Sequence, residues 1–240
     1  MIPKIIHYCW FGGNPLPESA KKCIASWRKF LPDYEIKEWN EDNFDVNIIP
    51  YTQQAYEAKK YAFVSDYARF WILYKYGGLY FDTDVELIKP MDDIIERGPF
   101  MGLEKTSVSN AVPKIAPGLG LGATPDMKIY GQILEDFHRM DFFAENGSIN
   151  PYSMIPMVTE LFSKLGFKGN RELECVAGIY IYPEDVFCPM DPTTGITTIT
   201  KNTVSIHHYN CSWLDHNTIH FRLHLLKNKI YRLLNKIHLK

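Results

Sequence analysis

Short apolar runs alternate with stretches of helical spacing along the first third of the chain. Runs rich in β-branched and aromatic residues predict strands, and apolar residues that recur every three or four positions predict helices. The predicted elements are, in chain order, a strand over 4–11, a helix over 19–30, a strand over 34–39, one or two helices over 52–76 and a strand over 79–85. We expect Ser19 to cap the first helix and Gly77 to end the last one. This order predicts an α/β domain whose mostly parallel sheet is flanked by helices.

The rest of the chain has a weaker pattern. Glycine and proline are frequent between residues 95 and 125, so we expect that stretch to be irregular. The other predicted elements are helices over 126–143 and 153–165 and strands over 179–182 and 203–207. From residue 217 on, apolar residues recur at steps of three and four, which predicts an amphipathic helix. We therefore divide the chain into a globular domain over 1–215 and a basic amphipathic helix over 216–240.

The composition is that of an ordinary globular protein. Of the 240 residues, 46% are hydrophobic and 22% are charged, which excludes an intrinsically disordered chain. The length fits one large α/β domain. The formal net charge is −2, so we expect no nucleic-acid partner. The charge is uneven, however, because residues 216–240 contain six basic residues and no acidic one.

Two interpretations of this basic tail stay open. A basic amphipathic helix can lie on an anionic membrane surface, which would place the protein beside a lipid-linked partner. Alternatively, the apolar face of the helix packs on the domain or on a second subunit. His216, His220 and His224 recur every fourth residue in this tail. Because no acidic ligand accompanies them, they indicate a solvated or phosphate-facing stripe rather than a zinc site.

Cysteine usage and the opening residues indicate the cytoplasm. The five cysteines are an odd number, and no two of them have the short spacing of a zinc or redox site. No apolar run reaches about 18 residues, the length that a membrane span needs. The first residues lack the order of a charged stretch followed by an apolar one, so we expect no signal peptide.

The strongest chemical pattern is the segment 77–84, in which two glycines and a short strand lead to Asp82 and Asp84. In an extended segment these two side chains point the same way. Two neighbouring carboxylates repel each other, and a divalent cation relieves the repulsion. Mg²⁺ and Mn²⁺ prefer such oxygen ligands and keep positions open for phosphates. Because open α/β sheets bind ligands at the carboxyl ends of their strands, we expect a metal site here.

Asp66 and Arg69 precede this segment and share one face of a predicted helix. One interpretation is a surface ion pair, which contributes little to stability. The apolar residues around the pair favour a second one, in which the pair is partly buried and meets ribose hydroxyls or a phosphate.

Near the other end, His207 and His208 follow a predicted strand and precede Ser212 and Trp213. A neutral imidazole can add a ligand to a Mn²⁺ ion, and a hydroxyl can add another. Neighbouring residues of a strand point to opposite sides, so His207 and His208 face different ways. Packed or exposed histidines are the alternative.

Together these segments resemble the sugar-binding region of glycosyltransferase family 32, which carries a DxD motif. The matching residues are Ala62, Ser65, Asp66, Arg69, Leu73, Gly77, Gly78, Tyr80, Asp82 and Asp84. The opening residues 2–13 and the closing stretch 207–213 also resemble this family. It groups bacterial capsular and exopolysaccharide transferases with fungal mannosyltransferases. The resemblance implies a GT-A fold and a metal-dependent, retaining transfer from a sugar nucleotide.

The resemblance also implies a role for each matching residue. Asp84 would bind the metal directly, and Asp82 would contact the ribose, the donor sugar and a metal-bound water. Asp66 and Arg69 would hold the donor sugar and its diphosphate. His207 would be the further metal ligand, because similar sequences often keep a histidine followed by a variable residue, and His208 is the alternative ligand.

Four more residues belong to this implied site. Ser212 and Trp213 would reach the metal and the leaving phosphate. Trp10 matches the tryptophan that stacks on uracil in the related large glucosylating toxins, and Tyr8 of the same opening motif would join the nucleotide-sugar site. A position in the core is the alternative for Trp10, although aromatic faces do bind bases without reading much sequence.

We therefore expect a hexose transfer from a nucleotide sugar to a glycan or lipid-linked glycan acceptor, with Mn²⁺ or Mg²⁺ as cofactor, in capsular or exopolysaccharide biosynthesis. Trp10 favours a UDP-linked hexose, whereas family relatives that use GDP-mannose keep guanosine open. No residue stands out as a nucleophile, which favours front-face attack by the acceptor. A transferase that modifies a protein and a non-catalytic nucleotide-sugar-binding protein are the alternatives.

One further pattern competes with this interpretation. Residues 118–123 fit the dinucleotide pattern G-x-G-x-x-[GA], which requires a strand before it and a helix within it. Pro113, Pro117 and Pro125 argue against both elements. We expect instead a loop beside the donor sugar or the acceptor.

Overall fold

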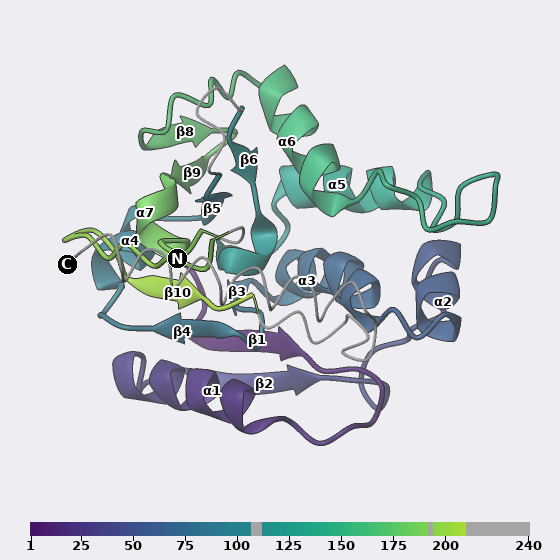
Figure 1. Ribbon diagram of the computed structural model, residues 1–240, viewed down its shortest axis with the longest axis horizontal. Helices are drawn as coiled ribbons and strands as arrows, with labels where there is room; N and C mark the ends of the chain where they lie inside the picture. Colours follow the sequence, from purple (N-terminus) through teal and green to yellow (C-terminus); the bar gives the residue numbers. More distant parts are fainter. Residues whose placement is uncertain (107–111, 192–193, 210–240) are drawn as a thin grey trace.

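A central sheet of eight strands runs through the part of the chain that the structure, a computed structural model, describes: residues 1–106, 112–191 and 194–209 (Figure 1). The strands are β1 (Ile5–Cys9), β2 (Glu35–Trp39), β3 (Gly78–Tyr80), β5 (Phe100–Glu104), β6 (Lys114–Ile115), β7 (Leu121–Ala123), β8 (Glu174–Val176) and β9 (Ile179–Tyr182). Their order is β2-β1-β3-β7-β5-β9-β8, with β6 paired to β5. The strands β1, β2, β3, β5 and β9 run in one direction, and β6, β7 and β8 run in the other. The predicted mostly parallel α/β sheet is confirmed.

Helices cover both faces of this sheet because successive strand residues point to opposite faces. The helices are α1 (Glu18–Phe30), α2 (Pro50–Glu57), α3 (Tyr61–Tyr76), α4 (Asp92–Arg97), α5 (Lys128–His138), α6 (Met154–Lys164), α7 (Glu184–Phe187) and the 3₁₀ helix η1 (Pro117–Leu119). On one face, Trp27 of α1 lies in a buried cluster with Tyr8 and Leu79. On the other face, Phe70 of α3 lies in a second cluster with Tyr80, and α5 packs against α3.

A second, two-stranded sheet brings the end of the described chain to the centre. Strand β10 (Ser205–His207) pairs antiparallel with β4 (Val85–Leu87), and His207 lies opposite Val85. Helix α1 holds β4 in place, because the indole N–H of Trp27 donates to the Val85 carbonyl at 2.7 Å. The hydroxyl of Ser26 accepts the N–H of Leu87 at 2.9 Å. This small sheet places the residues after β3 next to the residues at the end of β10.

The predicted continuous strand over 79–85 is wrong. Strand β3 ends at Tyr80, β4 begins at Val85, and a turn between them is closed by a 3.0 Å hydrogen bond from the Val85 N–H to the Asp82 carbonyl. Asp82 and Asp84 therefore do not share the orientation that an extended segment would impose. The turn allows each carboxylate to meet a different partner.

The stretch 95–125 is also more regular than its composition suggests. It contains β5, β6 and β7, and two of these strands belong to the middle of the sheet. The glycines are the reason for the wrong expectation. A side chain at Gly102 would collide with the ring of Phe187, and one at Gly122 would collide with the ring of Phe100. These strands need glycine for ring packing, and glycine weakens the sequence signal of a strand.

The other predicted elements agree with the structure except at their ends. The helical stretch 52–76 forms two helices, and Gly77 ends α3 with a φ of +63°. Helix α1 begins at Glu18 with Pro17 as its N-cap residue, so the expected Ser19 cap is wrong. Proline already holds the extended conformation that an N-cap residue needs, which lets the helix begin before Ser19. Strand β8 and helix α7 are too short to show a periodic pattern.

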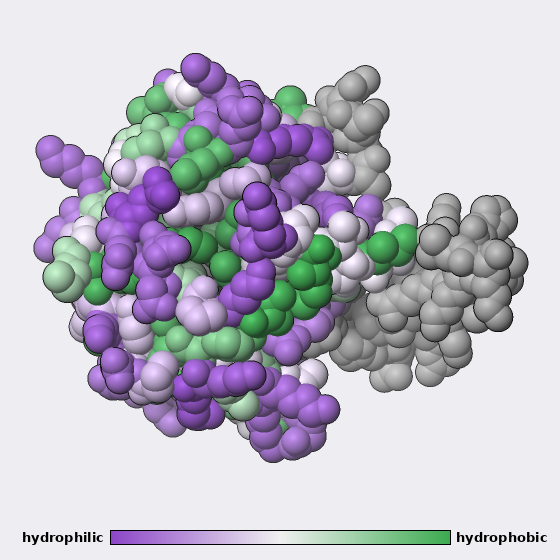
Figure 2. Space-filling model, turned by 90° about the vertical axis from the view of Figure 1, so that its left-hand side faces the viewer, coloured by the Kyte–Doolittle hydropathy of each residue, from purple (hydrophilic) through white to green (hydrophobic). Residues whose placement is uncertain are grey.

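The structure's described residues include no helix with the length and apolar character of a membrane span. The face shown in Figure 2 is largely polar, with smaller apolar patches between the polar side chains. The predicted amphipathic helix over 216–240 lies outside the described residues.

A buried histidine ties α3 to the first two strands. The Nε2 of His7 lies 3.0 Å from the Gly77 carbonyl, and its Nδ1 lies 3.1 Å from the indole nitrogen of Trp39. The carbonyl can only accept and the indole N–H can only donate, so the neutral ring carries its proton on Nε2. Burial lowers the pKa of His7 to about 4, and the nearby ammonium of Lys37 adds to this effect. The native fold therefore favours the neutral imidazole.

We predict that His7 makes the protein less stable as the pH falls from about 6.5 to about 4. In this window the unfolded chain binds a proton that the native histidine does not, so the free energy of unfolding decreases by up to about 2–3 kcal/mol. Urea unfolding at pH 7.0, 5.5 and 4.5 measures this loss. A His7→Gln variant should be less stable at pH 7 but should lose less stability on acidification, and parallel pH profiles would contradict the prediction.

Candidate functional site

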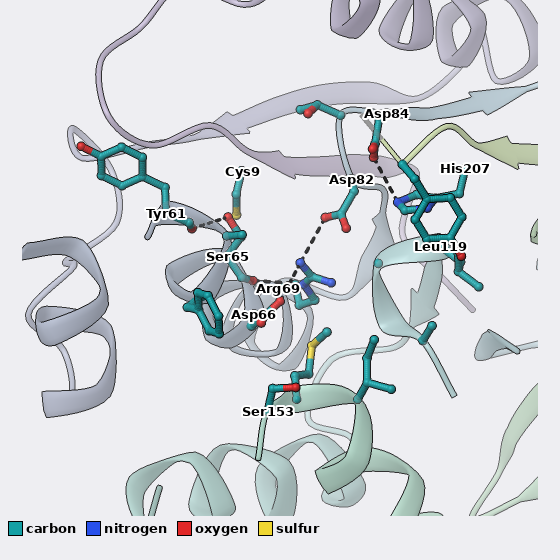
Figure 3. Close-up of a pocket in the computed structure, with 18 of the residues that line it drawn as sticks. Cys9, Tyr61, Ser65, Asp66, Arg69, Asp82, Asp84, Leu119, Ser153 and His207 are labelled. Atoms are coloured by element: carbon teal, nitrogen blue, oxygen red, sulfur yellow. Dashed lines mark hydrogen bonds and ion pairs between the residues drawn. The ribbon is translucent and has the colours of Figure 1, made fainter. Parts of the chain in front are cut away.

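A cavity of about 610 Å³ opens at the carboxyl ends of β1, β3 and β5. Cys9 and Trp10 reach it from β1, Asp82 and Asp84 reach it from the turn after β3, and Glu104 is the last residue of β5. Figure 3 shows Asp82 and Asp84 on one side of the cavity and Ser153, just before α6, on the other. This is the edge at which open α/β sheets bind ligands, as expected from the sequence.

Arg69 of α3 lies between two carboxylates. Its Nη2 is 3.1 Å from an oxygen of Asp66 and 3.1 Å from an oxygen of Asp82, and its Nε donates to the Ser65 carbonyl at 3.1 Å (Figure 3). The side chain is only 4% exposed. Burial alone would lower the pKa of Arg69, but the neighbouring carboxylates and the phenol of Tyr80 outweigh it and raise the pKa. The guanidinium is thus a fixed cation at the floor of the cavity.

The two carboxylates share this one cation, and the pKa of each is raised. Burial raises the pKa of Asp66 to about 6, since it outweighs the opposing effect of Arg69, and the charge of Asp82 raises it further. Burial also raises the pKa of Asp82 above its ordinary value, against the effect of Arg69. The phenol of Tyr80 donates to Asp82 at 3.1 Å and fixes the carboxylate on the side of Arg69.

Asp84 faces His207, which arrives from the other end of the chain on β10. The Nε2 of His207 is 3.1 Å from an oxygen of Asp84 (Figure 3). Burial would lower the pKa of His207, but the carboxylate of Asp84 raises it. His208 points away from this contact, and its Nε2 lies 2.8 Å from a carboxylate oxygen of Glu86. The imidazole of His207 therefore faces the Asp84 carboxylate, whereas His208 reaches this turn only with its N–H, which donates to the Asp84 carbonyl at 3.0 Å.

The pair of Asp84 and His207 has the chemistry of a metal site. A carboxylate oxygen and an imidazole nitrogen about 3 Å apart have the spacing of adjacent ligands in an octahedral shell with bonds of about 2.1 Å. The Nδ1 of His207 is buried without a hydrogen-bond partner among the described residues. Within the same residues, three or more His, Cys, Asp or Glu side chains nowhere form a common metal-binding cluster. The pair thus fits an ion that takes its remaining ligands from phosphates and water.

Of the other residues expected at the site, Trp10 and Tyr8 lie in the described part of the chain, but only Trp10 lines the cavity. Trp10 lines the cavity, and its indole N–H donates to the Asn14 carbonyl at 2.6 Å. Tyr8 does not line this cavity. It lies earlier on β1, on the face opposite to Cys9, where it packs against Trp27 and donates to Glu38 at 2.6 Å. Ser212 and Trp213 lie outside the described residues.

Several cavity residues were not identified in the sequence as site residues, and Glu104 and Tyr209 are among them. Glu104 lies in the stretch that was expected to be irregular, and Tyr209 follows the histidine pair. Gly118 lies in η1, where an added Cβ would collide with a carboxylate oxygen of Asp82. The segment 118–123 forms a 3₁₀ helix and strand β7 rather than the strand-and-helix unit of a dinucleotide site. For residues 118–123 the sequence predicted a loop beside the donor sugar or the acceptor, and Gly118 and Leu119 line the cavity.

Comparison with known proteins identifies the region that contains Asp66, Arg69, Asp82 and Asp84. Residues 17–101 match a family model described as the glycosyltransferase sugar-binding region containing DXD motif. Inositol phosphoceramide mannosyltransferase 3 of Schizosaccharomyces pombe is 33% identical over 122 residues, which cover 49% of this chain and 34% of that protein. The chain therefore spans about a third of this relative. The resemblance inferred from the sequence is confirmed.

Two solved structures share the fold. The PaToxG glycosyltransferase has a TM-score of 0.50 and 19% identity, with 70% of this chain and 73% of that chain covered. A glycosyltransferase involved in the glycosylation of the major capsid of PBCV-1 has a TM-score of 0.53 and 10% identity, with 96% and 100% covered. The predicted GT-A type fold is confirmed.

We predict that Gly118→Ala destabilises the protein by about 1–3 kcal/mol, because the new methyl group forces the Asp82 carboxylate away from Arg69. Gly131→Ala is the matched control. Gly131 lies in α5, and its added Cβ would make only ordinary contacts with Tyr74, so this substitution should be neutral or stabilising. Urea unfolding of both variants tests the difference. Equal stability of Gly118→Ala and the wild type would contradict it.

Proposed function

We propose that this chain, whose residues 17–101 match the DXD-containing sugar-binding region of glycosyltransferases, transfers a hexose from a nucleotide sugar to a glycan acceptor. The observation that carries the proposal is the convergence of three groups in one cavity at the carboxyl edge of the sheet. They are the Arg69 guanidinium between two carboxylates, the Asp84–His207 pair and the aromatic ring of Trp10. Nucleotide sugars present the matching chemistry: a diphosphate, hydroxyl groups and a flat base.

The strand order supports one direction for the bound donor. Along the carboxyl edge, β1 with Trp10 comes first, β3 with Asp82 and Asp84 comes next, and β5 with Glu104 lies beyond β7. We assign the base to the ring of Trp10, since aromatic side chains stack on bases. The diphosphate then lies near Arg69 and the Asp84–His207 pair. Asp82 contacts the ribose and the donor sugar, and Asp66 holds the sugar through its position beside Arg69.

A divalent cation, Mn²⁺ or Mg²⁺, completes this assignment. Asp84 and His207 would hold it, with Ser212 and Trp213 reaching the same place from outside the described residues. When bound, the ion supplies Lewis-acid stabilisation of the negative charge on the diphosphate. The donor set of one carboxylate oxygen and one imidazole nitrogen supports Mn²⁺ in particular.

The chain's own residues support departure of the nucleotide. As the bond between the anomeric carbon and the phosphate oxygen breaks, negative charge grows on the phosphate, and the fixed guanidinium of Arg69 stabilises it. We propose retention by front-face attack. The acceptor oxygen bonds to the anomeric carbon from the side of the departing phosphate, and its proton passes to a phosphate oxygen. A trapped covalent glycosyl-enzyme would overturn this step.

The donor and the cellular setting are proposals with weaker support. Trp10 supports a UDP-hexose, whereas the name of the fungal relative, a mannosyltransferase, supports a mannose donor. We propose a globular domain over 1–215 that acts in the cytoplasm on a glycan or lipid-linked glycan, in capsular or exopolysaccharide biosynthesis. The basic segment 216–240 would hold it on the inner membrane surface. The intact set of Asp66, Arg69, Asp82 and Asp84 argues against a purely binding role.

We predict that a nucleoside diphosphate raises the melting temperature only when Mn²⁺ is present. UDP and GDP, each with and without Mn²⁺, are compared by thermal shift on the wild type and on Asp84→Ala. The Asp84→Ala variant should lose the Mn²⁺-dependent shift because it removes one of the two proposed protein ligands. No shift with either nucleotide would contradict the proposed function, and a larger shift with GDP would move a mannose donor ahead of a UDP-hexose.

The two neighbouring histidines provide a matched pair of variants. We predict that His207→Ala weakens the Mn²⁺-dependent binding of UDP or GDP at least about tenfold, because it removes a ligand, while His208→Ala leaves it within about twofold. Isothermal titration calorimetry measures both. If His208→Ala has the larger effect, the assignment of His207 as the metal ligand is wrong.

A further inference from the structure

Glu104 is the one cavity carboxylate, among those the structure describes, that makes no ion pair within 4 Å, although Lys114 is its register partner on β6. Asp66 and Asp82 pair with Arg69, and Asp84 pairs with His207. No ion pair within 4 Å is found for Glu104 in the described part of the chain. The ammonium of the next residue, Lys105, turns away and donates to the Pro189 carbonyl at 3.0 Å. The Glu104 carboxyl group thus lines the cavity and keeps capacity to accept further hydrogen bonds.

Tyr209 holds Glu104 in its position. Its hydroxyl lies 3.3 Å from an oxygen of Glu104 and 3.0 Å from the sulfur of Cys188. The Tyr209 ring packs edge-on against His207, with their centroids 4.2 Å apart. The backbone of Tyr209 has a φ of +49°, a conformation that costs energy for a residue other than glycine. The native structure therefore keeps Tyr209 in an unfavourable backbone conformation, and in this conformation its hydroxyl reaches Glu104.

The location of Glu104 restricts what it can bind. A phosphate at this carboxylate would be repelled, because no ion pair within 4 Å in the described part of the chain offsets the like charge of Glu104. An uncharged group with O–H donors would be attracted, because the carboxylate can accept its hydrogen bonds. Glu104 lies beyond the Asp82–Asp84 turn on the side away from Trp10. In a nucleotide sugar, the group beyond the diphosphate is the sugar.

We propose that Glu104 accepts a hydrogen bond from a hydroxyl of the sugar being transferred, and that Tyr209 is its positioning residue. This inference rests on the proposed function and on the assigned direction of the donor. In this arrangement the diphosphate lies at Arg69 and the Asp84–His207 pair, and the sugar lies at Glu104. The carboxylate thereby contributes to the choice of sugar without contacting the nucleotide.

The test compares ligands with and without the sugar. Calorimetry in Mn²⁺ measures the dissociation constants of UDP and UDP-glucose and of GDP and GDP-mannose for the wild type, and the tighter pair is used for the variants. Glu104→Gln keeps the shape and removes the charge, and Glu104→Ala removes the acceptor. We expect the sugar nucleotide to bind about 5–10-fold more weakly to Glu104→Gln and about 10–100-fold more weakly to Glu104→Ala. The free diphosphate should bind both variants within about twofold of the wild type, which also shows that they are folded.

Two further variants separate this role from a structural one. Tyr209→Phe should weaken the sugar nucleotide less than Glu104→Ala does, again without a change for the free diphosphate. Glu86→Gln makes the same charge change on β4, where Glu86 contacts His208 outside the cavity, and it should change neither affinity. Equal weakening of both ligands by Glu104→Gln, or no weakening of either, would overturn the inference.

The outcomes also distinguish this inference from the proposed function. If the wild type binds neither diphosphate, the proposed function fails. If it binds a diphosphate and the Glu104 variants bind the sugar nucleotide like the wild type, only the inference about Glu104 fails. A variant effect on transfer to an acceptor without any effect on donor binding would assign Glu104 to the acceptor and likewise overturn the inference.

Discussion

The ion pairs of Arg69 are the interaction on which the rest of the site depends. One guanidinium that is only 4% exposed serves a carboxylate from its own helix and a carboxylate from the turn after β3. If either side of this arrangement were removed, the other would be a buried charge without a partner. Such a charge destabilises a protein by more than the intact ion pair stabilises it. The Ser65 carbonyl and the ring of Tyr80 hold the remaining sides of Arg69. Helix α3 and the turn therefore cannot shift independently, and Gly118 must stay small where it covers Asp82.

The small sheet of β4 and β10 imposes the second constraint. It is fastened to α1 by the Trp27 and Ser26 hydrogen bonds rather than to the large sheet. Its register sets His207 opposite Val85, one residue after Asp84. The large sheet thus fixes Arg69 and Asp82, and the small sheet fixes Asp84 and His207. The cavity lies where the two arrangements meet.

Much of this could be predicted from the sequence, for local reasons. The α3 pair of Asp66 and Arg69 follows from helical spacing, and Gly77 marks the end of that helix. The pairing of Arg69 with Asp82 could not be predicted, because it depends on a turn where a continuous strand was expected. Glu104 was missed because its strand, β5, was expected to be irregular. The glycines that the sheet needs for ring packing weakened the sequence signal of that strand. Tyr8 was placed at the site by its neighbours in the motif, although alternation along β1 turns it into the core.

The pairing of β4 with β10 also sets the order in which the site can be completed during synthesis. The segment of α3 and the Asp82–Asp84 turn leaves the ribosome more than a hundred residues before His207, and α1 and β1 to β3 are local enough to fold first. Until β10 is made, Asp84 has no imidazole partner and the edge of β4 is open. Occupancy of the cavity by a ligand that requires both Asp84 and His207 therefore reports that the chain has folded through to its last described strand. The same pair of residues thus joins the turn after β3 to β10, two segments that are synthesised far apart in time.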